Sequence, residues 1–472
     1  MTAIFTDGDT MITKEYINEL KIQNNEKLYR FLQEQKDNST IIFLLEHLGR
    51  LPLGFSGEYF IPLLQNKDDR VRLLAVKNIG KLSNSHYLEA VSRVATEDKN
   101  SNIRREAVSS IGRMRSPKAI PFLLEVLNDS DPKVVLQAIR ALLVFRSNLT
   151  VQESLKKLIT HPNEMIQYVI QKEFFPKKSL SNSKEKHRES PAFMKNVVVR
   201  GDVRDILKYV PDESVHLTFT SPPYYNARDY SIYQSYSEYL EFLAEVFKEV
   251  HRITKEGRFF LLNTSPIIIP RISRQHSSKR YPIPFDIHPY LIQMGWEFID
   301  DIVWEKPEAS VKNRNAGFLQ HRKPLAYKPN PVTEYVMVYR RKTDKLIDWA
   351  MRQYDWNTVK QSKVLEEYET SNVWKIDPTF DKVHSAVFPK ELCNRVIKLY
   401  SYKGDLVFDP FAGSGTLGKA AKSSGRYFFL TEKEWGYIER IRQEIGNKSL
   451  FDKTESRILD IEEFRKLAKG GK

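Results

Sequence analysis

The chain has 472 residues, and its 74 Lys and Arg against 60 Asp and Glu give a formal charge of +14. A single hydrophobic core stops growing near ~250–300 residues, so we expect more than one domain, and the positive charge favours an anionic partner such as nucleic acid. The one cysteine, Cys393, excludes an internal disulfide and a multi-cysteine zinc site. It is typical of a reducing compartment. The first residues resemble no secretory signal, and no apolar run approaches the ~20 residues of a membrane span, so we expect a cytoplasmic protein without membrane contacts.

The N-terminal part contains a repeated pattern. Three stretches, 69–80, 101–112 and 131–142, share apolar positions at offsets of 32 and 31 residues, and one position in each is a small residue: Ala75, Ala107 and Ala138. Each unit is expected to be a helix pair that buries its apolar face only against a neighbour, which predicts an α-solenoid. The pattern resembles HEAT-type repeats over about residues 40–175. We assign residues 1–175 to an all-α, HEAT-like domain, with an irregular helical bundle as the alternative.

Residues 176–194 are polar and rich in Ser and Lys, without periodicity, which predicts a linker. Beyond it, short β-rich runs alternate with helical segments. The expected strands are Val197–Val199, Val215–Thr220, Arg258–Asn263, Phe298–Trp304, Tyr335–Tyr339, Asp405–Phe408 and Tyr427–Leu430. This alternation predicts an α/β domain at 195–472 with a mostly parallel sheet covered by helices.

A glycine-rich motif, Asp409-Pro-Phe-Ala-Gly-Ser-Gly-Thr416, follows an apolar strand and opens a helix. Its glycines, Gly413 and Gly415, are expected to let the backbone pass close to a ligand. Glu432 ends the next strand, 19 residues after Gly413, where nucleotide-binding units hold a ribose. The motif lacks the third glycine of the dinucleotide fingerprint, which argues against NAD. Taken alone, the loop is also compatible with a tight structural turn.

A second motif, Ser221-Pro-Pro-Tyr224, stands at the end of the apolar strand Val215–Thr220. Its prolines have no N–H and hold the chain extended, so that carbonyl groups are presented rigidly beside a hydroxyl and an aromatic ring. The amine of a nucleobase is a poor nucleophile because its lone pair is delocalised. Hydrogen bonds from its N–H groups to Ser221 and to the Pro222 carbonyl would free the lone pair while Tyr224 stacks on the base. The tetrapeptide by itself is equally compatible with a turn that ends a strand.

Together the two motifs resemble those of the amino-group DNA methyltransferases, in the order of the β class. The resemblance covers about residues 195–445 and implies a Rossmann-like fold, S-adenosyl-L-methionine (AdoMet) as cofactor and no metal. It implies that the catalytic residues are Ser221, Pro222, Pro223 and Tyr224. It also implies that AdoMet is bound by Asp202, Phe388, Pro389, Asp409, Pro410, Phe411, Gly413, Ser414, Gly415, Thr416 and Glu432.

The amine that is methylated is expected to be N4 of cytosine, because in the family Ser before Pro-Pro is mostly associated with cytosine. Asp or Asn at that position is associated with N6 of adenine, which is the alternative. Methylation at C5 of cytosine needs a thiolate nucleophile, and Cys393 lies in a helical stretch without the expected Pro-Cys pair. An RNA target, or a HEAT-repeat binding protein with a non-catalytic methyltransferase scaffold, are further alternatives.

The expected partner is double-stranded DNA, from which the target nucleotide would be extruded. Two basic stretches, 271–280 and 312–328, are interpreted as loops that contact phosphates, with solvated loops as the alternative. The predicted contacts are Arg271, Arg274, Lys279, Arg280, Lys312, Arg314, Arg322 and Lys323. A target-recognition segment is expected at about 340–380.

The repeats are not expected to be the main DNA-binding surface. Residues 1–180 carry 26 Lys and Arg against 21 Asp and Glu, a net +5, whereas residues 181–472 carry 48 against 39, a net +9. Three roles remain open for the repeats: contact with the DNA backbone, docking of a partner such as a cognate restriction endonuclease, or dimer formation. The resemblance implies a nucleoid-associated prokaryotic enzyme of a restriction–modification system.

Overall fold

The computed structural model of the chain describes residues 3–5, 11–23, 25–51, 54–176, 186–225, 233–269, 273, 275–276, 278–310, 324, 331–379, 388–445 and 456–470. The chain divides into two compact units, Met1–Asn182 and Ser183–Lys472. The division falls inside the range 176–194, which the sequence predicts as a linker. Among the described residues, no helix is both long enough and apolar enough to cross a membrane.

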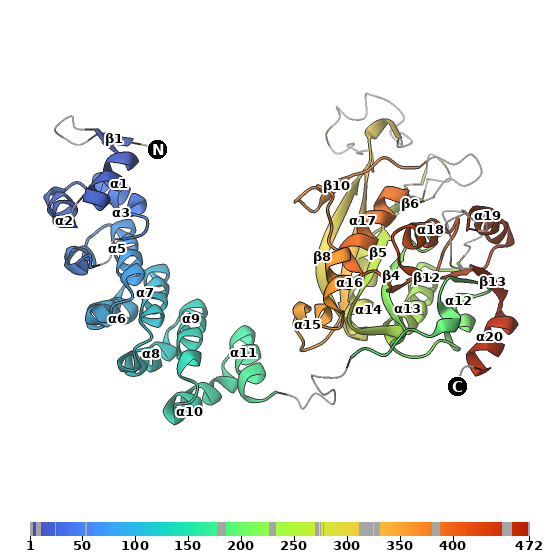
Figure 1. Cartoon of the computed structure of the whole chain (residues 1–472), viewed down its shortest axis with the longest axis horizontal. Helices are drawn as coiled ribbons and strands as arrows, with labels where there is room; N and C mark the ends of the chain where they lie inside the picture. The colour runs from blue at the N-terminus through green and yellow to red at the C-terminus, as the bar shows by residue number, and fades with distance from the viewer. Residues whose placement is uncertain are drawn as a thin grey trace. The chain divides into compact units, whose positions relative to one another are not determined.

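The first unit is a solenoid of stacked helix pairs (Figure 1). One layer consists of α3 (Asn38–His47), α5 (Asp69–Leu82), α7 (Ser101–Met114), α9 (Pro132–Leu142) and α11 (Glu164–Phe174). The other consists of α4 (Phe60–Leu63), α6 (Leu88–Glu97), α8 (Ile120–Glu125) and α10 (Leu149–Lys157). Because α5 packs on α7 and α7 on α9, each pair buries its apolar face against the next, as predicted. The repeats are preceded by β1 (Ala3–Phe5), β2 (Met11–Thr13), α1 (Lys14–Gln23) and α2 (Asn25–Glu34).

The repeat pattern follows from the first turns of these helices. The aligned positions Val71, Ile103 and Val134 are almost fully buried. Each helix begins after a polar side chain that accepts a backbone N–H of the first turn; these N-cap residues are Asp68, Asn100 and Asp131. In α5 and α7 an arginine of the first turn then forms an ion pair at 2.7 Å with an aspartate near the start of the next repeat; these pairs are Arg72–Asp98 and Arg104–Asp129.

The second unit is built on a nine-stranded sheet of order β10-β8-β9-β5-β4-β11-β12-β3-β13. Its strands are β3 (Val197–Arg200), β4 (Val215–Thr220), β5 (Thr254–Thr264), β8 (Trp296–Glu305), β9 (Thr333–Arg341), β10 (Val373–Lys375), β11 (Leu406–Asp409), β12 (Tyr427–Glu432) and β13 (Arg457–Asp460). Neighbours are parallel except for β9, which is antiparallel to both β5 and β8. The predicted strands and the mostly parallel sheet are confirmed, while the edge strands β10 and β13 were not predicted.

Helices cover both faces of this sheet (Figure 1). One hydrophobic cluster contains α12 (Val203–Leu207), α13 (Tyr236–Ile253), α14 (Ile283–Met294) and α20 (Ile461–Gly470). The other contains α17 (Lys390–Tyr400), α18 (Thr416–Ser423) and α19 (Trp435–Ile445). Strand β3 contributes Val197 and Val199 to the first cluster and Val198 to the second, because successive side chains of a strand point to opposite faces. Cys393 is buried in α17, and burial raises the pKa of its thiol well above its ordinary value.

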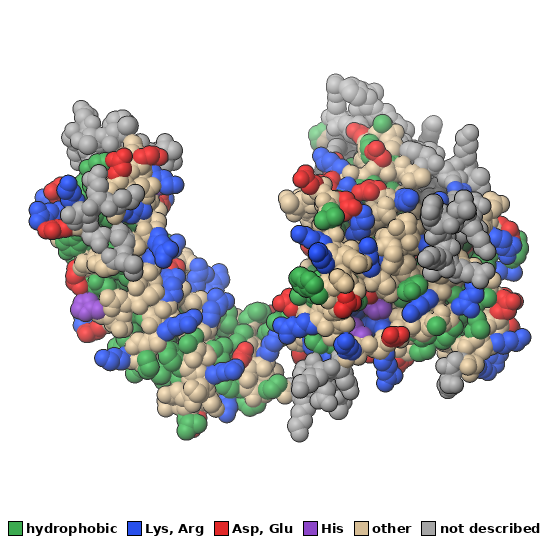
Figure 2. Space-filling model, viewed as in Figure 1, with side chains coloured by type: hydrophobic (Ala, Val, Ile, Leu, Met, Phe, Trp, Pro, Cys, Tyr) green, Lys and Arg blue, Asp and Glu red, His purple; other side chains and the backbone are tan. Residues whose placement is uncertain are grey.

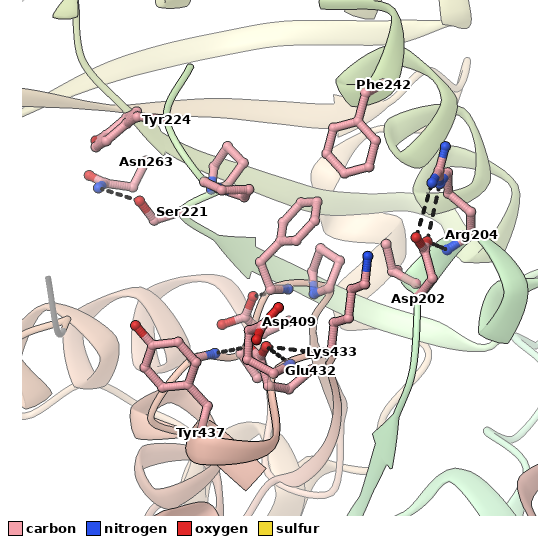
Figure 3. A pocket seen from close by; sticks show the side chains of 18 of the residues that line it. Asp202, Arg204, Ser221, Tyr224, Phe242, Asn263, Asp409, Glu432, Lys433 and Tyr437 are labelled. Carbon is pink, nitrogen blue, oxygen red and sulfur yellow. Dashed lines mark hydrogen bonds and ion pairs between the residues drawn. The ribbon is translucent and has the colours of Figure 1, made fainter. Parts of the chain in front are cut away.

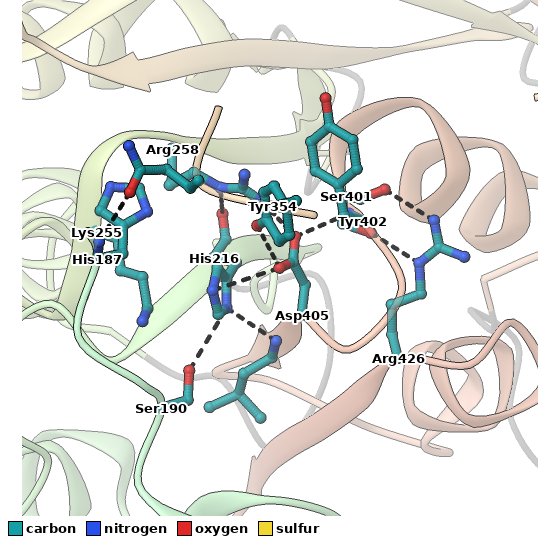
Figure 4. Close-up of polar contacts among 12 residues, drawn as sticks. His187, Ser190, His216, Lys255, Arg258, Tyr354, Ser401, Tyr402, Asp405 and Arg426 are labelled. Atoms are coloured by element: carbon teal, nitrogen blue, oxygen red, sulfur yellow. Dashed lines mark hydrogen bonds and ion pairs between the residues drawn. The ribbon is translucent and has the colours of Figure 1, made fainter. Parts of the chain in front are cut away.

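A buried polar cluster joins the amino ends of the central strands (Figure 4). Asp405, directly before β11, forms an ion pair with Arg258 of β5 and accepts a hydrogen bond from the Tyr354 hydroxyl at 2.5 Å. In β4, Nδ1 of His216 accepts the backbone N–H of Leu406 at 3.0 Å, so Nε2 carries the proton, 3.4 Å from Asp405 Oδ1. Burial lowers the pKa of His216 well below its ordinary value and keeps the ring neutral. One carboxylate therefore ties β4, β5 and β11 together.

The same cluster fixes part of the segment at 340–380 that we expected to recognise the target. Tyr354 lies between α15 (Ile347–Met351) and α16 (Trp356–Gln361), and its hydroxyl reaches Asp405 at the amino ends of the strands. Ligands of open α/β sheets bind at the opposite edge, outside the carboxyl ends. The part of the segment around Tyr354 therefore lies away from that edge.

Replacing Asp405 by Asn removes the counter-charge of the buried Arg258. Breaking a buried ion pair from one side typically costs ~3–5 kcal/mol, and we expect Asp405→Asn to lower the free energy of unfolding of the second unit by about that amount. All six tryptophans of the chain lie in this unit, so urea unfolding followed by tryptophan fluorescence isolates it. The matched control is Asp205→Asn, whose partner Lys208 is exposed, and it should change little. An equal decrease in the free energy of unfolding in the two variants would contradict the role given to Asp405.

Candidate active site

The carboxyl ends of β3, β4, β11 and β12 surround a cavity of about 550 Å³. The helices that follow β4 and β11, α13 and α18, belong to clusters on opposite faces of the sheet. Such a switch point leaves a crevice in which ligands of open α/β sheets bind. Most of the predicted site residues line the cavity: Asp202, Ser221, Pro222, Pro223, Tyr224, Phe388, Asp409, Pro410, Phe411, Gly413, Ser414, Thr416 and Glu432. The structure thus brings both motifs to one place, but Pro389 and Gly415 do not line it.

The glycine-rich loop meets Glu432 on one side of the cavity (Figure 3). Glu432 accepts the backbone N–H of Gly413 at one carboxylate oxygen and those of Lys433 and Glu434 at the other, each at 2.8 Å. Burial raises the pKa of Glu432. A carboxylate has about four lone-pair sites, so three backbone N–H groups leave one acceptor for a hydroxyl of a ligand.

The two glycines of the loop have different surroundings. Gly413 has φ +50°, and a Cβ built there would meet no atom within 4 Å, so the space beside it is open. Gly415 has φ +76°, and its Cβ would lie 2.9 Å from Cγ1 of Ile441 in α19. Gly415 therefore permits close packing of the loop against α19. Pro389 is the buried N-cap residue of α17.

The wall of the cavity beside β3 combines a carboxylate with aromatic rings. Asp202 caps α12 and forms an ion pair with Arg204 at 3.0 Å. The hydrogen bonds from Arg204 lower the pKa of Asp202 and keep it ionised, although its partial burial opposes this. The Arg204 guanidinium lies over the ring of Phe242 at 5.2 Å. Phe388 stacks on Phe219 with ring centroids 4.7 Å apart. Flat apolar surfaces next to a carboxylate suit an aromatic heterocycle that carries N–H or O–H donors.

On the other side, the Ser221–Tyr224 motif is held by residues that the sequence analysis did not assign to the site. Glu334 accepts the Tyr224 hydroxyl at 3.2 Å and Nδ2 of Asn263 at 2.7 Å, while its second oxygen accepts Nζ of Lys306 at 2.6 Å. Asn263 Nδ2 also lies 3.4 Å from the Ser221 hydroxyl (Figure 3). Asn263 Oδ1 is buried without a hydrogen-bond partner in the described part of the chain. Asn263 ends a predicted strand at the carboxyl edge, which is the signal that would have found it, whereas Glu334 reaches this edge because β9 runs antiparallel to β5.

The two motifs are connected directly. The hydroxyl of Thr220, next to Ser221, donates to Asp409 Oδ1 at 2.6 Å, and the backbone N–H of Phe411 donates to the same oxygen at 3.0 Å. Burial, supported by the nearby charge of Glu432, raises the pKa of Asp409 to about 7. The end of β4 and the start of the glycine-rich loop therefore share one buried carboxyl.

The predicted DNA-contacting residues are only partly described. Lys279 and Arg280 are exposed on β7 (Lys279–Tyr281), which pairs with β6 (Ile267–Ile269). Tyr281 of the same strand packs against Tyr225 at 5.0 Å, which brings this ribbon next to the Ser221–Tyr224 motif. The other predicted contacts lie outside the described residues: Arg271, Arg274, Lys312, Arg314, Arg322 and Lys323.

Two family models match the chain. Residues 215–443 match the family model described as DNA methylase. This match covers most of the second unit, which we call the methylase unit. Residues 58–144 of the solenoid match the model of HEAT repeats, so the resemblance of the solenoid to HEAT repeats is also confirmed.

The methylase unit is similar to several named methyltransferases. The Type II beta methyltransferase M.BslI of Bacillus sp. (strain NEB-606) is 27% identical over 274 residues, which are 56% of this chain and 28% of that protein. The Type II methyltransferase M.MwoI of Methanothermobacter wolfeii is also 27% identical, over 54% of this chain and 36% of its own length. The chain thus spans about a third of the length of these relatives. The orphan methyltransferase M.BamHII of Bacillus amyloliquefaciens is 28% identical, over 52% of this chain and 93% of its length.

Two solved structures are also similar. A candidate DNA modification methylase from Thermus thermophilus, complexed with S-adenosyl-L-methionine, is 24% identical with a TM-score of 0.45. The match covers 56% of this chain and all of that one. The PvuII DNA methyltransferase (cytosine-N4-specific) is 18% identical with a TM-score of 0.40, over 61% of this chain and 96% of that one.

Asp409→Asn removes the titrating group but keeps an acceptor for Thr220 and for the N–H of Phe411. Because burial raises the pKa of Asp409 from 3.8 to about 7, the protonated carboxyl stabilises the methylase unit at low pH, and this contribution is lost as the pH rises from about 4 to about 7. We expect the free energy of unfolding of Asp409→Asn, relative to the unsubstituted protein, to rise across that window and then level off. Urea unfolding followed by tryptophan fluorescence at several pH values measures this, and a difference independent of pH would contradict it.

Proposed function

We propose that the methylase unit transfers the methyl group of AdoMet to the exocyclic amine of a base in double-stranded DNA, and that this amine is N4 of cytosine. The observation that carries the proposal is the shared cavity of the Ser221–Tyr224 motif and the Asp409–Thr416 loop, which are joined by a hydrogen bond across 189 residues of chain. The family match and the relatives named as methyltransferases support it.

The cavity fits AdoMet in size and in the chemistry of its walls. Its volume, about 550 Å³, lies in the range of ~300–1,000 Å³ typical of cofactor sites. Glu432 has an acceptor left for a ribose hydroxyl, and Asp202, linked through Arg204 to the ring of Phe242, suits an adenine ring. The open space beside Gly413 leaves room for the amino-acid part. When bound, AdoMet supplies an electrophilic methyl group on a positively charged sulfur.

The Ser221–Tyr224 motif would activate the amine by position and hydrogen bonding. The Ser221 hydroxyl and the Pro222 carbonyl accept its N–H groups, so that the lone pair is no longer shared with the ring. Tyr224, whose hydroxyl is fixed by Glu334, presents its ring for stacking. Because a base inside a duplex cannot reach this cavity, the target nucleotide must be extruded. Lys279 and Arg280, which are exposed on the ribbon next to the motif, would contact phosphates.

The choice of cytosine rests on Ser221 before the two prolines, by resemblance to the family. Methylation of adenine N6 is the second candidate, because Ser221 and the Pro222 carbonyl would accept from either amine. The relatives' names suggest that the enzyme protects specific DNA sites, with or without a cognate endonuclease.

Identifying the methylated base tests the proposal. The full chain is incubated with methyl-labelled AdoMet and unmethylated bacterial genomic DNA, and the DNA is then digested to nucleosides and separated. We expect the label in N4-methylcytosine. Label only in N6-methyladenine would overturn the choice of base, label only in an RNA substrate would overturn the choice of polymer, and no label would overturn the activity. Tyr224→Ala serves as the inactive control.

Glu334→Gln tests the network around the motif. The substitution removes the counter-charge of Lys306 and weakens the acceptor of Asn263 and Tyr224. Misplaced groups of this kind cost up to about 100-fold in rate, so we expect kcat to fall roughly 10- to 100-fold with KM for AdoMet nearly unchanged. Glu241→Gln is the matched control, because that exposed rim residue contacts Ser237 and not the motif. A variant that loses only AdoMet affinity would contradict the assignment.

A further inference from the structure

The solenoid carries a row of basic side chains on the layer formed by α5, α7 and α9. We call the exposed Lys77, Lys81, Arg113 and Arg140 the basic stripe. Lys81 and Arg113 occupy one repeat position, 32 residues apart, and Lys77 and Arg140 occupy another, 63 residues apart. Figure 2 shows Lys and Arg side chains gathered along the edge of the solenoid where these helices lie. Successive repeats therefore place positively charged side chains at equivalent positions of neighbouring helices.

The stripe is anchored to the solenoid. A Cβ at Gly80 of α5 would overlap the Arg113 guanidinium and the Ser110 hydroxyl, so the guanidinium of α7 lies directly against the backbone of α5. Arg113 also donates to Ser110 Oγ at 2.9 Å, and Lys81 donates to Asn78 Oδ1 at 2.9 Å. The cationic groups of neighbouring repeats are thus held close together instead of extending freely into solvent.

This arrangement brings several positively charged side chains close to one another. Burial, followed by the charges of Lys21, Lys77 and Arg113, lowers the pKa of Lys81. Among the described residues, Glu106 is the carboxylate that forms an ion pair with the stripe, through Arg113 at 2.9 Å. Mutual repulsion opposes folding of the solenoid. A bound polyanion would relieve that repulsion.

We propose that the basic stripe binds the phosphate backbone of double-stranded DNA. The proposal rests on the proposed function, which makes a duplex the substrate. Packed helices lie ~8–10 Å apart, and phosphates of one strand follow each other at ~3.4 Å along the duplex axis, so successive helices of the layer meet about every third phosphate. Phosphate contacts carry no sequence information, and the contact is therefore independent of sequence. A regular polyanion matches the regular repeat better than the irregular surface of an acidic protein.

The salt dependence of binding tests this stripe. A labelled 40-bp duplex of mixed sequence is titrated with the full chain at several salt concentrations, and binding is followed by fluorescence anisotropy. Each phosphate contact contributes about 0.9 to the slope of log K against log salt. The triple variant Lys77→Gln, Lys81→Gln, Arg113→Gln should therefore reduce the slope by about 2 to 3 and weaken binding at ~0.1 M salt by at least about tenfold.

A second triple variant controls for net charge. Arg93→Gln, Lys118→Gln and Lys156→Gln remove three exposed cations from α6, from the turn before α8 and from α10, and should leave the slope within about 0.5. Circular dichroism melting of both variants checks that the solenoid is folded. An unchanged slope in the stripe variant, equal losses in both variants, or tighter binding of a 40-bp RNA duplex would each overturn the proposal.

The methyl-transfer assay separates the two proposals. If the unsubstituted chain methylates DNA but the stripe variant shows an unchanged salt dependence of duplex binding, the inference about the stripe is wrong and the proposed function stands. If no DNA is methylated but the stripe variant shows the expected weaker salt dependence of duplex binding, the proposed function is wrong while duplex binding by the solenoid stands.

Discussion

The hydrogen bond from Thr220 to Asp409 is the contact on which the rest of the site depends. It connects the last residue of β4 with the last residue of β11, and each strand leads directly into one of the two motifs. Both side chains are buried, so water does not compete for the bond. Since Asp409 also accepts the N–H of Phe411, one carboxyl sets the end of the strand before Ser221 and the start of the loop around Gly413.

The opposite ends of the same strands are fixed as firmly. Asp405 and His216 tie the amino ends of β11 and β4, and Arg258 adds β5. A slip of one residue in register would turn every side chain of a strand to the other face of the sheet. With β4 and β11 held at both ends, the distance between the motifs is set by the sheet and not by the loops. This gives the candidate site the preorganisation that positioning a weak nucleophile requires.

The parts of the fold that the sequence predicts are those with local signals. The central strands and the repeat helices have a periodicity, and both motifs are contiguous. The roles of Glu334 and Gly415 have no such signal. Glu334 meets Tyr224 because β9 lies beside β5 in the strand order, and Gly415 is constrained by Ile441 of a later helix. Tyr354 falls in the segment 340–380, which was expected to recognise the target because of its place between the later strands and the cofactor half in the family, whereas its hydroxyl belongs to the buried cluster.

The net charge of the N-terminal part also did not indicate where the charged side chains of the solenoid gather. At +5 over residues 1–180 the repeats looked nearly neutral, but the last turns of α5 and α7 each carry a basic residue and no acidic one. Aspartates stand at the helix starts, where they cap N–H groups or pair with an arginine of the first turn, as Asp68 and Asp98 do. Lys81 and Arg113 stand in the last turns, where the carbonyl ends of the helix favour a cation. Stacking such helices in parallel lines up the cations of their last turns, so a repeat with little net charge can still present a strongly basic edge.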